Sequence, residues 1–222
     1  MNKQTAVIIG ATGLIGSLLL EKLLNDDAFD KIRVLVRRPF AKQHPKLEVE
    51  VVDFSNLEDY AAKLGKGDCI FCAIGTTKKK MKGDKVAYRK IDYDIAVNAA
   101  QFGKKAGFSQ YLLVSSVGAD VQAKGFYLQL KGEVEQAIEA IGFKSLHLFQ
   151  PSFLLGIRNE VRFGEAMMKK FLNPLSGLFT GKWTKYKAIE ANAVANAMIA
   201  AAKQGNLGKK IYQYGEMIEL NG

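Results

Sequence analysis

The stretch from Thr5 to Gly16 constrains the fold more than any other part of the chain. Thr5–Ile9 is rich in β-branched residues and predicts a buried strand, and an apolar run with helical spacing starts at Ser17. Between the two stand three glycines spaced three apart, Gly10, Gly13 and Gly16. Glycines let a backbone turn sharply and approach a pyrophosphate, which the first free amides of the helix then face. This layout predicts a dinucleotide-binding turn rather than a purely structural one.

Length and composition are those of an ordinary globular protein. The 222 residues, 48% of them hydrophobic, suffice for one sizeable core or for one core with a small lobe. We expect no membrane span, because no stretch is long and apolar enough. The chain enters a strand within a few residues, which argues against a signal peptide, and it has two cysteines. We therefore expect a cytoplasmic protein.

The formal net charge of +10 invites a nucleic-acid or acidic-membrane interpretation. The lysines, however, are scattered along the chain, and the one dense run, Lys78–Lys79–Lys80 with Lys82 nearby, has no interleaved aromatic residues. That run favours a solvated loop over a polyanion site, and we expect no nucleic-acid partner. Part of the positive excess suits an anionic cofactor.

Cys69 and Cys72 form a C-x-x-C pair without the second pair that a zinc site needs. They lie in a predicted strand, where residues three apart are about 10 Å from each other, too far for a disulfide. We expect both to be buried small apolar residues, and neither His44 nor His147 to be a ligand. The sequence therefore predicts no metal site.

Strands and helices alternate along the chain, which predicts an α/β fold with a doubly wound parallel sheet. The expected strands are Thr5–Ile9, Ile32–Val36, Leu47–Asp53, Cys69–Ile74, Tyr111–Val114, Ser145–Phe149 and Lys210–Tyr214. The expected helices are Leu14–Leu24, Leu57–Leu64, Lys85–Ala106, Phe126–Ile141 and Ile189–Lys203, and Glu160–Phe171 is a further segment. We expect Ser55 to cap the second of these helices, and Val86 and Ile91 to lie on the packing side of the third. Residues 1–222 form a single domain in this interpretation, with a cofactor-binding core (1–151) and a small C-terminal substrate lobe (152–222).

The end of the second strand carries Arg37 and Arg38. NAD-specific sites place an acidic residue here, on the ribose hydroxyl, whereas guanidinium groups suit a 2′-phosphate. The pair predicts NADP(H) as cofactor, and the alternative is a basic surface turn. At the ends of later strands, Asp53–Phe54 is expected near the adenine, and Gly75–Thr76–Thr77 is expected to face the same crevice.

Tyr127 and Lys131 are four residues apart on the helix after the fifth strand, so they share one helical face. An ammonium group, together with a positive nicotinamide, lowers the pKa of a phenol. The tyrosine can then exchange a proton with a carbonyl or alcohol oxygen while hydride moves to or from a cofactor. Ser115 or Ser116, at the end of the preceding strand, can donate a hydrogen bond to the same oxygen. Ordinary helix-surface residues are the alternative interpretation.

Together these motifs resemble the short-chain dehydrogenase/reductase superfamily in its atypical branch, and more closely the Tat-interacting-protein-like oxidoreductases. The resemblance covers roughly Gln4 to Arg162. It rests on Gly10–Ala11–Thr12–Gly13, Val36–Arg37–Arg38, Gly75–Thr76–Thr77, Val114–Ser115–Ser116–Val117–Gly118–Ala119–Asp120, Tyr127–Leu128–Gln129–Leu130–Lys131–Gly132–Glu133 and Gln150–Pro151.

The resemblance implies a Rossmann fold, an NADP(H) site and the roles of its residues. The phosphates would be held by Gly10, Thr12, Gly13, Leu14, Ile15, Gly16, Arg37 and Arg38. The adenosine and ribose would be bound by Ala73, Ile74 and Gly75, and the nicotinamide ribose by Lys131. The nicotinamide would lie beside Pro151, Phe153 and Leu154. Tyr127 would be the proton donor or acceptor. Thr76, Thr77, Arg158 and Arg162 are candidates for substrate contacts. Many superfamily members place a relay asparagine on the helix after the fourth strand. Asp92 falls in that neighbourhood and Asn98 lies further on, and neither is assigned the role.

Two functions from different classes follow. The first is an NADPH-dependent oxidoreductase acting on a small carbonyl or alcohol substrate. The second is a non-catalytic NADP(H)-binding regulator that reports the cofactor state to a protein partner. The retained tyrosine, lysine and serine favour the enzyme, because a sensor needs none of them. A homodimer or a protein partner is left open, and nothing in the sequence names the substrate.

Overall fold

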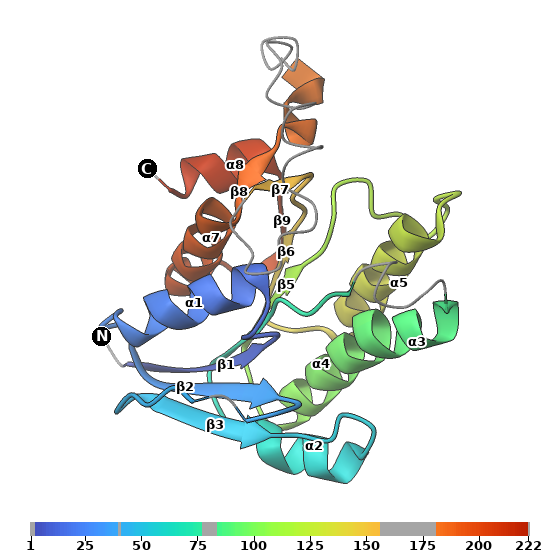
Figure 1. Cartoon of the computed structure of the whole chain (residues 1–222). Helices are drawn as coiled ribbons and strands as arrows, with labels where there is room; N and C mark the ends of the chain where they lie inside the picture. The colour runs from blue at the N-terminus through green and yellow to red at the C-terminus, as the bar shows by residue number, and fades with distance from the viewer. Residues whose placement is uncertain (1–2, 40, 77–83, 156–180, 222) are drawn as a thin grey trace.

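The computed structural model describes residues 3–39, 41–76, 84–155 and 181–221. Its centre is a parallel sheet of seven strands in the order β3-β2-β1-β4-β5-β6-β9 (Figure 1). These strands are β1 (Gln4–Ile9), β2 (Phe29–Val36), β3 (Leu47–Val51), β4 (Cys69–Cys72), β5 (Gln110–Val114), β6 (Ser145–Phe149) and β9 (Gly208–Tyr212). The order reverses between β1 and β4, so the doubly wound Rossmann sheet expected from the sequence is confirmed.

Helices cover both faces of the sheet (Figure 1). On one face lie α1 (Leu14–Leu24), α7 (Ala191–Gln204) and α8 (Tyr214–Glu219). On the other lie α2 (Leu57–Leu64), the consecutive segments α3 (Lys85–Arg89), η1 (Lys90–Asp94) and α4 (Ile95–Lys105), and α5 (Phe126–Ile141). A small second sheet pairs β7 (Leu154–Leu155) with β8 (Ile189–Glu190), just after η3 (Gly181–Tyr186).

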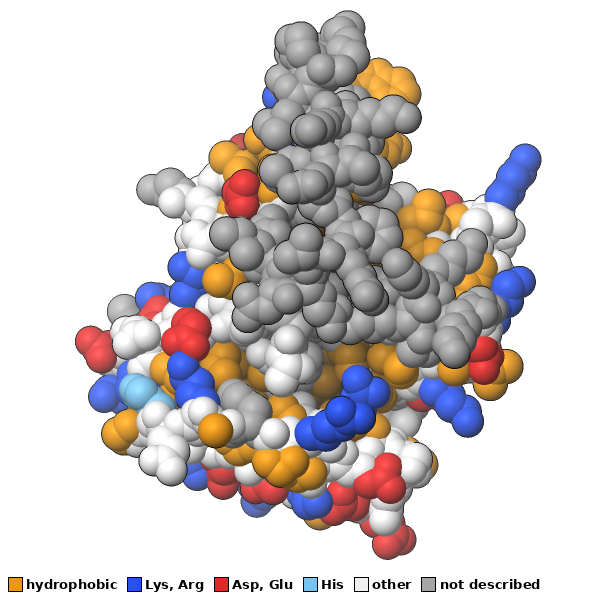
Figure 2. Space-filling view, in the orientation of Figure 1, with side chains coloured by type: hydrophobic (Ala, Val, Ile, Leu, Met, Phe, Trp, Pro, Cys, Tyr) orange, Lys and Arg blue, Asp and Glu red, His pale blue; other side chains and the backbone are white. Residues whose placement is uncertain are grey.

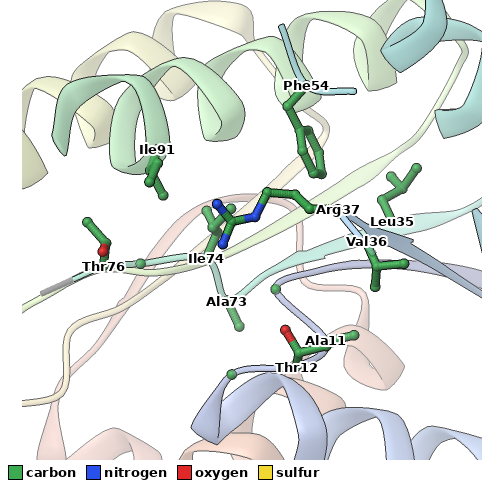
Figure 3. A pocket seen from close by; sticks show the side chains of 13 residues that line it. Ala11, Thr12, Leu35, Val36, Arg37, Phe54, Ala73, Ile74, Thr76 and Ile91 are labelled. Atoms are coloured by element: carbon green, nitrogen blue, oxygen red, sulfur yellow. The ribbon is translucent and has the colours of Figure 1, made fainter. Parts of the chain in front are cut away.

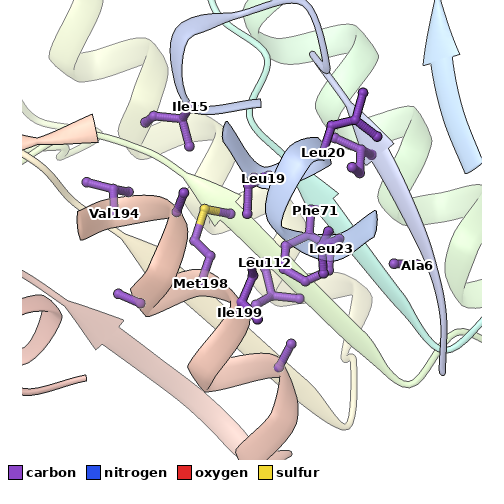
Figure 4. Packing of buried hydrophobic residues seen from close by; sticks show 14 of the residues in the cluster. Ala6, Ile15, Leu19, Leu20, Leu23, Phe71, Leu112, Val194, Met198 and Ile199 are labelled. Carbon is purple, nitrogen blue, oxygen red and sulfur yellow. The ribbon is translucent and has the colours of Figure 1, made fainter. Parts of the chain in front are cut away.

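Successive residues of β1 face opposite layers. Ala6 and Ile8 belong to the cluster under α1 and α7, whereas Val7 and Ile9 belong to the cluster under α2, α4 and α5. A strand covered on both faces must be apolar at every position, which is why this stretch reads as a continuous run. In the first cluster, Leu19 and Leu23 of α1 lie close to Met198 of α7 and to Phe71 and Leu112 of the sheet (Figure 4).

Several expected boundaries were wrong by a few residues. Leu47–Asp53 ends as a strand at Val51, and Cys69–Ile74 ends at Cys72. Ser55 does not cap α2: Asn56 is the N-cap, and its side chain accepts hydrogen bonds from the amides of Glu58 and Asp59, at 3.1 Å each. Ser55 instead donates to Asp53. An asparagine one residue closer to the first turn reaches those amides better than the serine does.

The C-terminal part differs more from the expectation. Ile189–Glu190 is the strand β8 rather than the first turn of a helix, and Tyr214 begins α8 rather than ending a strand. The capping box between Gln213 and Glu216 explains that switch. Two elements of the expected C-terminal lobe belong to the main fold: β9 is a strand of the main sheet, and α7 lies in one of its helical layers. The segment Glu160–Phe171 lies outside the described residues. A substrate-binding role for 152–222 stays a prediction.

The long helix expected over 85–106 has a π-helical turn, η1, in its middle. Val86 was wrongly placed on its packing side: it is 67% exposed, whereas Tyr88 and Ile95 are buried. Cys69 and Cys72 are fully buried in β4, as expected, and burial raises the pKa of both thiols. Within the described residues, no helix is long and apolar enough to cross a membrane.

Candidate functional site

The turn between β1 and α1 is built from backbone. Gly10 has a φ of +90°, and a Cβ there would lie 2.6 Å from the carbonyl oxygen of Ala73. A Cβ on Gly16 would lie 2.0 Å from the carbonyl oxygen of Gly10. These two glycines therefore let α1, the turn and the segment after β4 approach one another.

Gly13 is less crowded than Gly10 and Gly16. A Cβ there would lie 3.1 Å from the Gly10 oxygen, a tight contact that a small shift would relieve, and 3.8 Å from the Ala73 oxygen. Gly13 is the N-cap of α1, and it has no side chain to accept hydrogen bonds from the first-turn amides. The side chain of Ile15 is buried in the core and that of Leu14 packs against it, so these two residues offer a ligand mainly their backbone amides. A helix N-terminus of this kind fits an anionic pyrophosphate.

A cavity of about 190 Å³ opens beside this turn (Figure 3). Its described lining comes from the glycine turn, the ends of β2 and β4, and one residue of η1. These residues are Gly10, Ala11, Thr12, Gly13, Leu35, Val36, Arg37, Phe54, Ala73, Ile74, Gly75, Thr76 and Ile91. The sequence had placed most of them at a cofactor. It had taken Ile91 for a packing residue, and Ile91 does pack against the cluster under α2, α4 and α5 while also lining the cavity. It missed Leu35 and Val36, whose apolar pattern is that of any buried strand.

The two arginines after β2 are not equivalent. Both are exposed, but Arg37 lines the cavity and extends between Phe54 and Ile74 in Figure 3, whereas Arg38 is not among the described lining residues. Phe54 also lines the cavity, with its ring 4.7 Å from that of Tyr60 in an edge-on contact. Asp53 instead accepts hydrogen bonds from the hydroxyl and the amide of Ser55, at 2.6 and 2.9 Å.

Tyr127 and Lys131 lie one turn apart on α5, and the Lys131 Nζ is 5.9 Å from the centre of the Tyr127 ring. The tyrosine is 42% exposed, whereas the lysine is 4% exposed. Burial alone would lower the pKa of Lys131, but the nearby acid Asp92 and then Tyr127 outweigh it and hold that pKa above its ordinary value. Lys131 is therefore charged, and its charge faces the phenol.

Two residues that sequence reasoning did not assign connect Tyr127 and Lys131 to the cavity. Asp92 of η1 forms an ion pair with Lys131 at 3.1 Å and accepts a hydrogen bond from the amide of Thr76 at 2.9 Å. The Tyr88 ring is 6.4 Å from that of Tyr127, and its hydroxyl donates to the Thr76 carbonyl at 2.9 Å. Thr76 lines the cavity, so the two regions share the segment after β4.

The serines after β5 point to different environments. Ser115 is 4% exposed, and Ser116 is half-buried. The amide of Ser115 donates to the Phe149 carbonyl and that of Val117 to the Pro151 carbonyl, which ties this segment to the end of β6. Phe153 and Leu154 are partly exposed beyond it. Thr77, Arg158 and Arg162 lie outside the described residues, as do Lys78–Lys80 and Lys82.

Comparison with known proteins decides the family. Residues 10–146 match a family model described as NAD(P)H-binding. The chain belongs to this NAD(P)H-binding family. It is also 34% identical to Protein HTATIP2 of Rattus norvegicus, over 90% of this chain and 81% of that protein. This confirms the resemblance to Tat-interacting-protein-like members of the atypical short-chain dehydrogenase branch.

Further relatives are fungal, and solved structures of low sequence identity share the fold. The chain is 34% identical to Protein FMP52-1, mitochondrial, of Scheffersomyces stipitis over 98% of each. Its fold matches the UDP-N-acetylglucosamine 4-epimerase from Methanobrevibacter ruminantium M1, with a TM-score of 0.72 and 17% identity over 96% of this chain and 77% of that one. The Bordetella bronchiseptica enzyme WbmH in complex with NAD+ gives 0.72 and 18% over 96% and 76%. These two structures show the fold alone, and with a relative named mitochondrial the cytoplasmic location stays a prediction.

Figure 2 shows how charged side chains are distributed on one face of the protein. Lysine and arginine side chains are spread over that face and interspersed with acidic ones, rather than gathered into one basic surface. Arg37, which lines the cavity, is one of the cations that an anionic cofactor would meet.

Proposed function

We propose that this protein is an NADPH-dependent oxidoreductase that acts on a small carbonyl or alcohol substrate, with Tyr127 as proton donor or acceptor. One observation carries the proposal: Tyr127 and the buried, charged Lys131 are linked through Tyr88 and Asp92 to Thr76, a residue that lines the cavity beside the glycine turn. A protein that only binds a dinucleotide has no need of a charged lysine held beside a phenol.

The preference for NADPH rests on Arg37. This side chain lines the cavity at the end of β2, where the sequence offers no carboxylate for a ribose hydroxyl. A guanidinium group matches a phosphate in both geometry and charge. The cavity would therefore select the cofactor that carries a 2′-phosphate, and the glycine turn would hold its pyrophosphate on the first amides of α1.

When bound, NADPH would supply the hydride. The residues of the chain do the remaining work during reduction. The Tyr127 hydroxyl donates its proton to the substrate oxygen, and the Lys131 ammonium stabilises the phenolate that is left. Ser116, the less buried of the two serines, donates a hydrogen bond to the same oxygen. In oxidation each proton moves in the reverse direction.

The test is NADPH oxidation by the purified chain against a panel of aldehydes, ketones and quinones, repeated with Tyr127→Phe. Tyr214→Phe on α8 is the matched control, since it makes the same change far along the chain. We expect turnover that Tyr127→Phe lowers by roughly 10²–10⁴ and Tyr214→Phe preserves. Tight NADPH binding with no turnover on any substrate would support the regulator instead.

A further inference from the structure

We propose that Asp92 is a positioning residue, whose two carboxylate oxygens hold the Lys131 ammonium and the Thr76 amide in one fixed arrangement. The inference rests on the proposed function in one respect: it takes Lys131 as the cation beside the cofactor and Tyr127. It goes beyond that function, because it gives a purpose to a buried acid that is part of neither the glycine turn nor the tyrosine–lysine pair.

The geometry gives each oxygen of Asp92 its own donor. Oδ1 faces the Lys131 Nζ at 3.1 Å, and Oδ2 accepts from the Thr76 amide at 2.9 Å. Asp92 is 1% exposed, so water does not compete for either oxygen. A buried carboxylate costs several kcal/mol unless it is paired and hydrogen-bonded, and here both conditions are met.

This arrangement requires a carboxylate rather than an amide. An asparagine at position 92 has one acceptor oxygen and one NH₂ donor. Whichever way the amide were turned, its NH₂ would face either the Thr76 amide or the Lys131 ammonium, both of which are donors.

The local backbone brings this acid inward. Asp92 lies in the π-helical turn η1, and both Asp92 and Tyr88, four residues before it, are buried. Single π turns within α-helices are often found at functional sites. Here the turn carries a charged residue on the buried face of the helix, which is otherwise apolar, and this residue pairs with the lysine of α5.

Asp92 is also the acid that pairs directly with Lys131 and raises its pKa. The titratable groups that face Lys131 are Asp92 from η1, Tyr127 and Glu135 from α5, and Cys72 from β4. The Glu135 carboxylate is taken by the side-chain amide of Gln150, at 3.0 and 3.1 Å. Burial keeps the Cys72 thiol protonated. Without Asp92, a buried lysine would lose its proton more easily.

The experiment measures the titration of Lys131 in the full chain. Lysine ε-carbons are labelled with ¹³C, the Lys131 resonance is assigned by its absence from Lys131→Met, and its midpoint is compared in the unmodified protein, Asp92→Asn and Asp94→Asn. Asp94 lies in the same π turn, so its variant makes the same charge change. We expect the midpoint to fall by at least about one pH unit in Asp92→Asn and to stay put in Asp94→Asn. Equal midpoints in all three proteins would overturn the proposal.

Should Asp92→Asn fail to fold, the double variant Asp92→Asn/Lys131→Met takes its place. It removes both charges, so it should fold better than Asp92→Asn alone, and a double variant that is no better would overturn the proposal. NADPH affinity separates this inference from the proposed function. In Asp92→Asn it should become pH-dependent over the range in which Lys131 titrates. If the titration midpoint of Lys131 shifts but the NADPH affinity does not depend on pH, Asp92 keeps its positioning role and Lys131 does not contact the cofactor.

Discussion

The glycine turn and the tyrosine–lysine region lie at the same edge of one sheet but are built in different ways. The turn is made of backbone from consecutive residues, with two glycines that let segments touch and a third, Gly13, that is less crowded. The other region is made of side chains from α5, η1 and the segment after β4, joined by a buried ion pair. The first region contains no group that titrates, whereas the second depends on the charge of one lysine.

The largest effect should come from filling the turn. Gly13→Val should abolish NADPH binding and leave the fold intact, because its side chain would occupy the place of the pyrophosphate. Gly16→Ala is the contrasting variant: its Cβ would lie 2.0 Å from a backbone oxygen, so it should lower the melting temperature. Calorimetric titration and thermal unfolding of both proteins check this. A folded Gly13→Val with full NADPH affinity would contradict it.

In the tyrosine–lysine region, Tyr127→Phe should lower turnover by roughly 10²–10⁴, the usual scale for a positioned acid or base. NADPH affinity should hardly change, since the phosphates are held elsewhere. Lys131→Ala should weaken NADPH binding as well as slow turnover, because this side chain would serve both the ribose and the phenol. Single-turnover hydride transfer measures both variants. A rate within a few-fold of the unmodified protein would remove Tyr127 from the mechanism.

The two regions also differ in how far the sequence predicts them. The glycine turn is local, so strand, glycines and helix could be read from the order of residues, and α1, α5 and β6 have the bounds expected. The pairing of Asp92 with Lys131 could not be read in this way. It depends on η1 packing against α5, and on a π turn that changes the helical period by which side chains are assigned to faces.

The smaller errors have the same origin. Val86 fits the apolar period of its helix, yet it is the second residue of α3 and is exposed. Ile189 starts an apolar run of helical type, but its partner strand lies some 35 residues earlier, at Leu154. Arg37 and Arg38 are indistinguishable as neighbours in a sequence, whereas in the structure only the former is among the described residues that line the cavity.

That last difference gives a matched pair of variants. Arg37→Ala should remove most of the preference for NADPH over NADH, at about 1.5–3 kcal/mol for a charged hydrogen bond, which is roughly ten- to a hundredfold in affinity. Arg38→Ala makes the same change one residue further on and should cost less. Calorimetry with both cofactors is the measurement. Equal affinity of the unmodified protein for NADPH and NADH would refute the preference itself.

The last effect concerns acid, and it distinguishes β6 and β9 from the opposite end of the sheet. His147 of β6 is fully buried, with Nδ1 3.0 Å from the Tyr212 hydroxyl of β9. Burial, and secondarily Lys210, lowers the pKa of His147 from 6.5 to about 4. The other histidine of the chain, His44, is only half-buried and lies just before β3, at the opposite edge of the sheet.

The sign follows from which state binds the proton. Between pH 6.5 and about 4 the unfolded chain protonates His147 and the folded chain does not, so stability is unaffected above pH 6.5 and falls as the pH drops through this window. The loss is at most about 1.4 kcal/mol per pH unit. His147→Gln should therefore flatten the dependence of the unfolding free energy on pH. Hydrogen exchange at about pH 5 should show β6 and β9 losing protection before β1 and β2; equal loss at both ends would mean that acid acts on the sheet as a whole.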